Sequence, residues 1–345
     1  MALMPTPKDV IHRDGTAALY RFRRPGTSSP AHPTPKPPPQ APEAVGPAGK
    51  LPLLLVPSMI NRWYVLDLRE GASMAAALTR AGIDTFCLDW GVPEDEDRYL
   101  SWEDVLDRLG RAVRAVRRAT GAPKVGVLGY CMGGTLSAIW SALHPEQVAA
   151  LINLAGPIDF SQAGFLGEMV DARFFDAGAI AAAGNMSPPQ MQAGFTALRP
   201  TTQIAKWVGL IDRGFDPAVL ESFQALETWA GDNVPFPGAA YKTYIEELYQ
   251  QNLLVKGGHY VRGRRADLGN IRCPVLTVVA ERDAICPPLA ATALNDRSGS
   301  TDREILTVSG GHVGAVVGAK ASKVLYPAIA AWLGKKLRGE AAEAA

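Results

Sequence analysis

The amino-acid sequence predicts an α/β fold built on a mostly parallel central sheet. Three observations support this: short runs rich in Val, Ile and Leu recur along the chain, helical patterns lie between them, and one long helical segment interrupts their rhythm. Nearly continuous apolar runs are typical of strands that are buried on both faces of a parallel sheet. The predicted strands are residues 51–56, 84–89, 124–129, 148–154, 274–280 and 304–308.

The first 48 residues precede this pattern and divide into two parts. Residues 1–24 hold enough apolar side chains for a short pair of strands lying on the core. Residues 25–48 are rich in proline and nearly devoid of large apolar side chains, so we expect an exposed loop, partly in the polyproline II conformation. A docking motif for a partner that binds this conformation is the alternative.

Residues 101–118 show a helical pattern between two of the predicted strands. Apolar side chains share one face and arginines lie opposite. Ser101 is placed to cap this helix, and the carboxylate of Asp104 suits its first turn. We expect a crossover helix with a solvated arginine face. The core is expected to comprise residues 49–156 and 269–338, with a C-terminal tail at 339–345.

The strand rhythm stops between residues 157 and 268. This segment holds helical patterns and many aromatic residues, and Tyr241, Tyr244, Ile245 and Leu248 share one helix face. We interpret it as a mainly helical cap inserted after the strand at 148–154. Most of its aromatic side chains are expected in the core, and a few are expected to line a tunnel.

Composition bounds the class of protein. The chain has 345 residues, 47% of them hydrophobic, which is ample for a large core. With 35 Lys and Arg against 34 Asp and Glu, no broad field favours nucleic acid or an anionic membrane. The four cysteines lack the spacing of a disulfide scaffold, and no apolar run approaches the roughly 20 residues that span a bilayer. We expect a cytoplasmic protein without a signal peptide or transmembrane segment.

A strand, a tight turn and a helix are predicted to meet at VLGYCMGGT, residues 127–135. Gly129 and Gly133 flank Cys131 at the positions where a strained turn needs small residues. The dipole and free N–H groups of the following helix favour a thiolate at Cys131. This is the nucleophile-elbow pattern of the α/β-hydrolase fold, with Cys in place of the usual Ser. The alternative is a buried structural cysteine, which is our interpretation of Cys87 inside a strand.

In this fold the nucleophile is followed along the chain by an acid and then by a histidine. Three histidines follow Cys131. His144 would lie about 20 Å away along the elbow helix, which is too far. His259 follows a Gly-Gly pair in what we expect to be a surface loop. His312 follows the last strand in SGGHVGAVVG, where glycines let a loop carry the imidazole over the elbow, so His312 is the predicted base.

Two carboxylates, Glu281 and Asp283, stand at the end of the strand at 274–280. Asp283 is the predicted acid because it lies deeper in the loop, with Glu281 as the alternative. The oxyanion hole is expected to use the backbone N–H of Met132 and one from the loop after the first core strand, that of Met59 or Ile60. No metal-binding or nucleotide-binding motif stands out, so no cofactor is expected.

Seven segments of the sequence together look familiar: TPKDVIHRDGTAALYRF, VPSMINRWYVLDLREGASM, LDWGVPEDEDRYLSWEDV, GYCMGG, SALHPEQV, RCPVLTVVAERDAICPP and GGHVGAVVGAKASKVLYPAIAAWL. With these segments the sequence resembles, over nearly its full length, the catalytic subunit of polyhydroxyalkanoate (PHA) synthases, most of all the short class III type. Family members often place His directly after the acid, whereas this chain has Ala284, and the proline-rich stretch is longer than expected.

The resemblance implies polyester synthesis from an (R)-3-hydroxyacyl-CoA, with release of CoA. It implies that Cys131 holds the growing chain as a thioester, that His312 activates the incoming hydroxyl and that Asp283 supports His312. The implied partners are a separate accessory synthase subunit, in a homo- or hetero-oligomer, and the surface of a polyester granule. Two other hypotheses remain: a cysteine hydrolase (a thioesterase or polyester depolymerase) on the same scaffold, and an inactive granule-associated scaffold.

Overall fold

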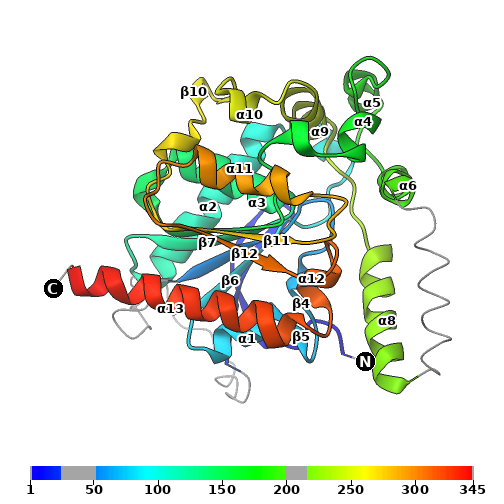
Figure 1. The fold of residues 1–345 in the computed structure, drawn as a ribbon. Helices are drawn as coiled ribbons and strands as arrows, with labels where there is room; N and C mark the ends of the chain where they lie inside the picture. Colours follow the sequence, from blue (N-terminus) through cyan, green and yellow to red (C-terminus); the bar gives the residue numbers. More distant parts are fainter. Residues whose placement is uncertain (1, 25–51, 199–215, 344–345) are drawn as a thin grey trace, which may run out of the picture.

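The computed structural model describes residues 2–24, 52–198 and 216–343, and its central feature is an eight-stranded sheet (Figure 1). The strand order is β1-β2-β6-β3-β7-β8-β11-β12. Pairing is antiparallel between β1, β2 and β6 and parallel through the rest. The strands are β1 Lys8–Asp14, β2 Ala17–Phe22, β3 Leu53–Val56, β6 Thr85–Asp89, β7 Val125–Tyr130, β8 Val148–Leu154, β11 Val275–Ala280 and β12 Arg303–Val308. The predicted α/β-hydrolase fold with a mostly parallel sheet is confirmed.

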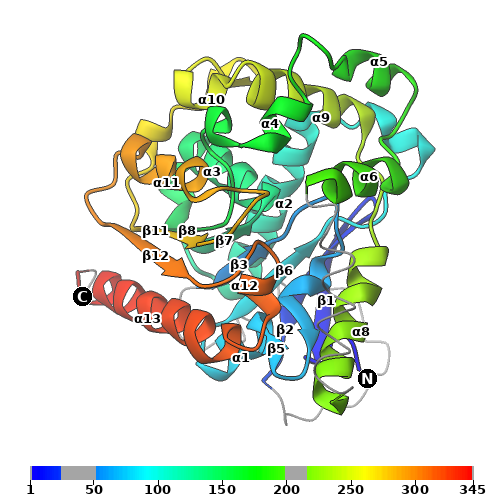
Figure 2. The same ribbon diagram turned by 45° about the vertical axis from the view of Figure 1, so that its right-hand side comes forward.

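Helices cover both faces of the sheet (Figures 1 and 2). Helices α1 and α13 lie on one face, and α2, α3 and α11 lie on the other. Successive residues of β3 serve the two faces in turn: Leu53 and Leu55 pack on the first side, Leu54 and Val56 on the second. The helices are α1 Met74–Arg80, α2 Trp102–Thr120, α3 Met132–Leu143, α11 Pro288–Arg297, α12 Gly314–Val317 and α13 Tyr326–Glu343.

Each predicted core strand and the crossover helix are confirmed, and no end differs from the prediction by more than two residues. The side chain of Ser101 accepts a hydrogen bond from the N–H of Asp104, and the carboxylate of Asp104 accepts one from the N–H of Ser101. This reciprocal pair satisfies two backbone donors at the start of α2. The N-terminal strand pair is also confirmed, and a small ribbon, β4 Asp67–Arg69 with β5 Ala72–Ser73, precedes α1.

The segment between β8 and β11 is mainly helical in its described parts. Figure 2 shows α4, α5, α9 and α10 together at the top of the view, whereas α8 lies apart from them, beside β1. A short hairpin, β9 Tyr260–Val261 with β10 Arg264–Arg265, was not predicted. The division into core and cap stays a prediction. The helices are α4 Phe165–Met169, α5 Ala177–Ala182, α6 Pro188–Leu198, α8 Pro217–Gly231, α9 Gly238–Thr243, a π-helix Tyr244–Gln250 and α10 Leu253–Lys256.

Some sequence-based expectations fall on residues that the structure does not describe. The proline-rich stretch 25–48 and the aromatic residue Trp207 lie outside the described residues. Helix α13 continues to Glu343, into the segment set aside as a tail. Within the described ranges, no helix combines the length and the apolar character needed to cross a bilayer.

Candidate active site

The chain turns sharply at Cys131, between the end of β7 and the start of α3. Cys131 has φ 57° and ψ −129°, a backbone conformation that residues other than glycine rarely adopt. Its N–H donates to the carbonyl of Leu154 at 3.0 Å, and its own carbonyl accepts from the N–H of Gly134 at 2.8 Å. Hydrogen bonds to two neighbouring elements therefore hold the strained turn. The structure has the predicted elbow, with Cys131 at the N-terminus of a helix.

The glycines around Cys131 allow backbone segments to pass in contact. A Cβ atom on Gly129 would lie 2.3 Å from the carbonyl oxygen of Gly133. A Cβ atom on Gly133 would lie 2.0 Å from the carbonyl oxygen of Val56 at the end of β3. Both distances are far inside van der Waals contact with backbone atoms that have little freedom to move. The predicted need for small residues is confirmed.

Two loops beyond the sheet bring His312 and Asp283 together. The Nδ1 atom of His312 lies 2.7 Å from Oδ2 of Asp283, and both side chains are almost fully buried. The other oxygen of Asp283 accepts hydrogen bonds from the N–H groups of Ile285 and Cys286, each at 2.9 Å. These backbone donors fix the carboxylate toward the imidazole. Glu281, the alternative acid, is exposed to solvent.

The third member of this group is Cys131. Burial acts to lower the pKa of His312, but the charge of Cys131 and the hydrogen bond to Asp283 outweigh it and raise this pKa to about 10. Among the described residues, the buried Nε2 atom has no nitrogen or oxygen partner. The structure thus brings the three predicted residues together. Their catalytic roles stay a prediction.

Tyr130 packs against this histidine, a contact that the sequence analysis missed. Its ring stacks on the imidazole of His312, with centroids 5.3 Å apart and an angle of 25° between the planes. Burial raises the pKa of Tyr130, so the phenol stays neutral. The ring limits the orientations open to His312. Tyr130 lies beside Cys131 in the elbow, but no sequence signal links it to residue 312.

The predicted oxyanion donors lie on either side of the elbow. Met132 is the first residue of α3, and Met59 follows β3; both are buried. The N–H of Ile60, the alternative donor, has Ser58 Oγ as a partner at 3.4 Å. Ile60 also lines the cavity that opens beside Cys131, so the choice of Met59 over Ile60 stays a prediction.

The other two histidines that follow Cys131 each contact a side chain outside the candidate site. His144 ends α3 as predicted, and its ring packs on Trp140 with centroids 4.9 Å apart. His259 lies in a loop, as expected, but the expectation that this position is at the surface is wrong, because its side chain is fully buried. Its Nδ1 atom lies 2.8 Å from Oε2 of Glu247. A carboxylate from the π-helix thus pairs with one ring nitrogen, a partner that the local Gly-Gly signal does not reveal, whereas the buried Nε2 atom has no hydrogen-bond partner among the described residues. Cys87 is buried in β6, as predicted.

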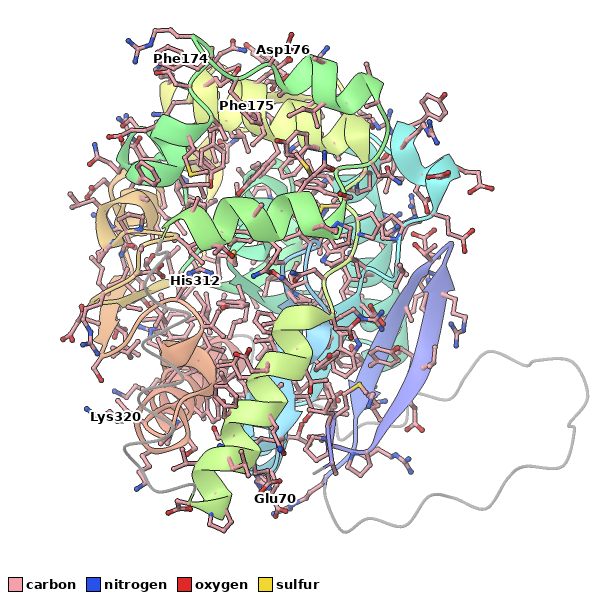
Figure 3. All side chains as sticks on the ribbon, turned by 90° about the vertical axis from the view of Figure 1, so that its right-hand side faces the viewer. Glu70, Phe174, Phe175, Asp176, His312 and Lys320 are labelled. Atoms are coloured by element: carbon pink, nitrogen blue, oxygen red, sulfur yellow. The ribbon has the colours of Figure 1, made fainter. Side chains whose placement is uncertain are left out.

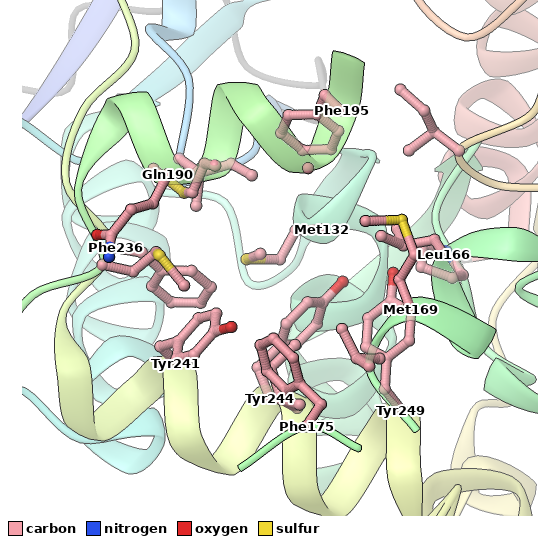
Figure 4. A pocket seen from close by; sticks show the side chains of 18 of the residues that line it. Met132, Leu166, Met169, Phe175, Gln190, Phe195, Phe236, Tyr241, Tyr244 and Tyr249 are labelled. Atoms are coloured by element: carbon pink, nitrogen blue, oxygen red, sulfur yellow. The ribbon is translucent and has the colours of Figure 1, made fainter. Parts of the chain in front are cut away.

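A cavity of about 170 Å³ opens beside Cys131, and mostly cap side chains line it (Figure 4). Figure 3 shows His312 on the core side of the cap, with Phe174 and Asp176 at its outer edge. The sequence did not reveal which aromatic residues would line such a space. They are Phe175, Phe195, Phe236, Tyr241, Tyr244 and Tyr249.

The wall of the cavity is mainly apolar, with aliphatic, methionine and aromatic side chains from α4, α6 and the π-helix. Such a lining suits an acyl chain and limits access of water. Across the described ranges, no cluster of three or more His, Cys, Asp or Glu side chains is arranged to hold a metal ion.

Comparisons with known proteins agree with this geometry. Residues 52–319 match the family described as the alpha/beta hydrolase fold. The chain is 33% identical over 334 residues to the poly(3-hydroxyalkanoate) polymerase subunit PhaC of Allochromatium vinosum, with 96% of this chain and 89% of that protein covered. The chain belongs to the PhaC family. The PhaC subunit of Synechocystis sp. is 32% identical, with 96% of this chain and 85% of that protein covered.

Solved structures support the fold of this PhaC family member. A hydrolase from Pseudomonas aeruginosa is similar with a TM-score of 0.55 at 15% identity, over 95% of this chain and 98% of that one. At this identity the likeness concerns the fold alone.

Proposed function

We propose that this PhaC family member is a polyhydroxyalkanoate synthase that transfers (R)-3-hydroxyacyl groups from CoA to a growing polyester through an acyl-cysteine at Cys131. The main support is one arrangement of a reactive group and a cavity. Cys131 stands on a strained turn beside the buried His312–Asp283 pair, and it lines an apolar cavity. The family relationship supports the substrate class.

The raised pKa of His312 suits the first half of this reaction. With the imidazole protonated, Cys131 reacts as a thiolate and attacks the carbonyl carbon of the acyl-CoA thioester. The bond from that carbon to the CoA sulfur breaks, and the departing sulfur takes the proton of His312. The products are CoA, a neutral imidazole and an acyl-cysteine, a nearly isoenergetic exchange of thioesters.

The second half returns the site to its starting state. The neutral imidazole takes the proton of a 3-hydroxyl group, whose oxygen attacks the acyl-cysteine carbonyl. An ester bond forms, the carbon–sulfur bond to Cys131 breaks, and the protonated His312 again faces a thiolate. Backbone N–H groups, those of Met132 and Met59 in our assignment, would stabilise the oxyanion in each half. Water must be excluded throughout, because it would release a free hydroxy acid.

We further propose that the protein works with a separate accessory synthase subunit at the surface of a polyester granule. The support is the resemblance of the chain to the short class III type of catalytic subunit, which spans nearly its whole length.

Product analysis tests this function. The purified chain is incubated with (R)-3-hydroxybutyryl-CoA, with and without a class III accessory subunit, and CoA and acyl products are measured together. We expect CoA and insoluble polyester, with more of both when the subunit is present. Release of CoA with free 3-hydroxybutyrate as the sole acyl product would replace the synthase by a hydrolase. No release of CoA under either condition would favour an inactive scaffold.

A further inference from the structure

Two tyrosines of the π-helix, Tyr244 and Tyr249, share the cavity wall with Cys131. Their rings meet edge to face with centroids 5.4 Å apart, and each phenol affects the pKa of the other. Figure 4 shows both hydroxyls on the cavity side of their rings. Neither has a role in the proton transfers described above.

The π-helix explains why both rings reach one cavity. In an α-helix, residues five positions apart point about 140° away from each other around the axis. A π-helix closes its hydrogen bonds between residues five apart, so such residues lie close to one full turn from each other. The wider winding of Tyr244–Gln250 therefore places Tyr249 above Tyr244 on the same side. Single π-turns of this kind are frequent at functional sites.

Surrounding aromatic rings hold the two phenols in place. Tyr244 packs against Trp102 at 5.4 Å and against Phe160 at 5.8 Å between centroids, and Tyr249 packs against Phe160 at 4.7 Å. Trp102 begins α2 of the core and is itself buried. The hydroxyl pair is therefore fixed before any ligand arrives.

The same phenols lie within electrostatic reach of the nucleophile. Burial raises the pKa of both Tyr244 and Tyr249, and the charge of Cys131 raises both further. Tyr241 also lines the cavity, but only burial raises its pKa. The charge of Cys131 thus acts on the phenols of Tyr244 and Tyr249 and is not a cause of the raised pKa of Tyr241. Both remain neutral O–H donors at neutral pH.

A mainly apolar cavity with a few fixed polar groups orients a ligand through those groups. An acyl unit on Cys131 offers a β-oxygen, as a free 3-hydroxyl or as the ester oxygen of a longer chain. We propose that the Tyr244 and Tyr249 hydroxyl pair binds this β-oxygen and selects 3-hydroxyacyl groups over acyl groups that lack it. This inference rests on the proposed function, because it concerns the acyl group that Cys131 accepts.

The experiment compares two acyl donors that differ only at the β-carbon. The first release of CoA is measured in single turnover with (R)-3-hydroxybutyryl-CoA and with butyryl-CoA. For Tyr249→Phe and Tyr244→Phe, we expect the preference for the hydroxyacyl donor to fall about tenfold or more. Each variant removes a hydroxyl that binds the β-oxygen, so the rate with (R)-3-hydroxybutyryl-CoA falls, whereas butyryl-CoA has no β-oxygen to lose this contact. The phenyl ring preserves the aromatic packing. Tyr241→Phe is the matched control and should leave the ratio unchanged.

Two outcomes would overturn the inference. One is an unchanged ratio in both variants, whether both rates are retained or both fall equally. The other is the same change of ratio in Tyr241→Phe. An equal loss would mean that the hydroxyls serve the structure alone. The wild-type protein separates this failure from that of the proposed function. If it releases no CoA from (R)-3-hydroxybutyryl-CoA, or yields only free hydroxy acid, the synthase assignment fails before any variant is compared.

Discussion

His312 lies between a sulfur and a carboxylate, and the balance of charge around it decides its protonation. Burial alone would favour the neutral imidazole, because a charged ring loses its hydration. The neighbouring Cys131 and Asp283 reverse this preference and raise the pKa of His312 to about 10. These two neighbours therefore favour the protonated form of the ring. In the proposed reaction, that proton is the one that the departing CoA sulfur takes.

Asp283→Asn tests this account of His312. We expect the pKa of His312 to fall toward its usual range, because the variant removes the negative charge, and acyl transfer at pH 7 to fall by about 10²- to 10⁴-fold. NMR titration of the imidazole and CoA release measure the two effects. Glu281→Gln is the matched control, since Glu281 is an exposed carboxylate of the same loop. An equal effect of the two substitutions would contradict the account.

The same shift predicts how stability depends on pH. The folded-state pKa of His312 lies above the unfolded value, so its contribution to stability is fully present below about pH 6.5 and is lost as the pH rises through about 10. The free energy of unfolding of the wild type, from urea titrations, should therefore decline between pH 6.5 and 10. The decline should be smaller in Asp283→Asn. The same slope in both proteins would show that Asp283 does not support the charge.

At this scale the sequence identified the candidate residues well and their surroundings poorly. The order of nucleophile, acid and histidine left few choices, and the structure brings Cys131, Asp283 and His312 together. The choice between Asp283 and Glu281 depended on which carboxylate the turn buries, and the structure buries Asp283 and exposes Glu281. The stacking of Tyr130 on His312 joins residues from distant parts of the chain, so no local pattern predicts it.

Among the elements, the elbow is the one whose sequence is most constrained. Helix α3 of the elbow passes close to the end of β3. A methyl group on Gly133 would therefore collide with the carbonyl oxygen of Val56. We expect Gly133→Ala to lower the free energy of unfolding by about 3 kcal/mol, the upper part of the range for overpacking, and to displace Cys131. Urea unfolding measures the first effect and CoA release the second.

Gly231→Ala is the matched control for this substitution. Gly231 ends α8, and a Cβ atom there would have no neighbour within 4 Å. Its effect on stability should stay within about 1 kcal/mol, and activity should be retained. If Gly133→Ala were as stable and as active as Gly231→Ala, close backbone packing would not be what requires glycine at 133.

Elements that follow one local pattern were predictable, whereas those set by contacts were not. The strands and α2 follow from apolar runs and a helical period, and their ends lie within one or two residues of the prediction. The π-helix was not predicted, because the spacing of Tyr241, Tyr244, Ile245 and Leu248 is that of an ordinary helix. Likewise, the burial of His259 depends on Glu247, a partner twelve residues earlier.

In the molecule as a whole, the reactive groups and the cavity come from different parts. Cys131, Asp283 and His312 follow strands of the sheet, whereas helices between β8 and β11 supply most of the cavity wall. The sequence indicated a helical segment with many aromatic residues, but it could not show which of them face inward. An elbow alone does not separate a synthase from a hydrolase. The difference must lie in how the helical segment admits the hydroxyl group of an acyl unit and excludes water.

The most direct test of the central claim is the mass of the acylated protein. The chain is mixed with (R)-3-hydroxybutyryl-CoA and quenched with acid, and its intact mass and peptides are measured. We predict one or more added hydroxybutyryl units on the peptide that contains Cys131, the same result in Cys87→Ala, and no adduct in Cys131→Ala. An adduct on another residue, or undiminished CoA release by Cys131→Ala, would contradict the account.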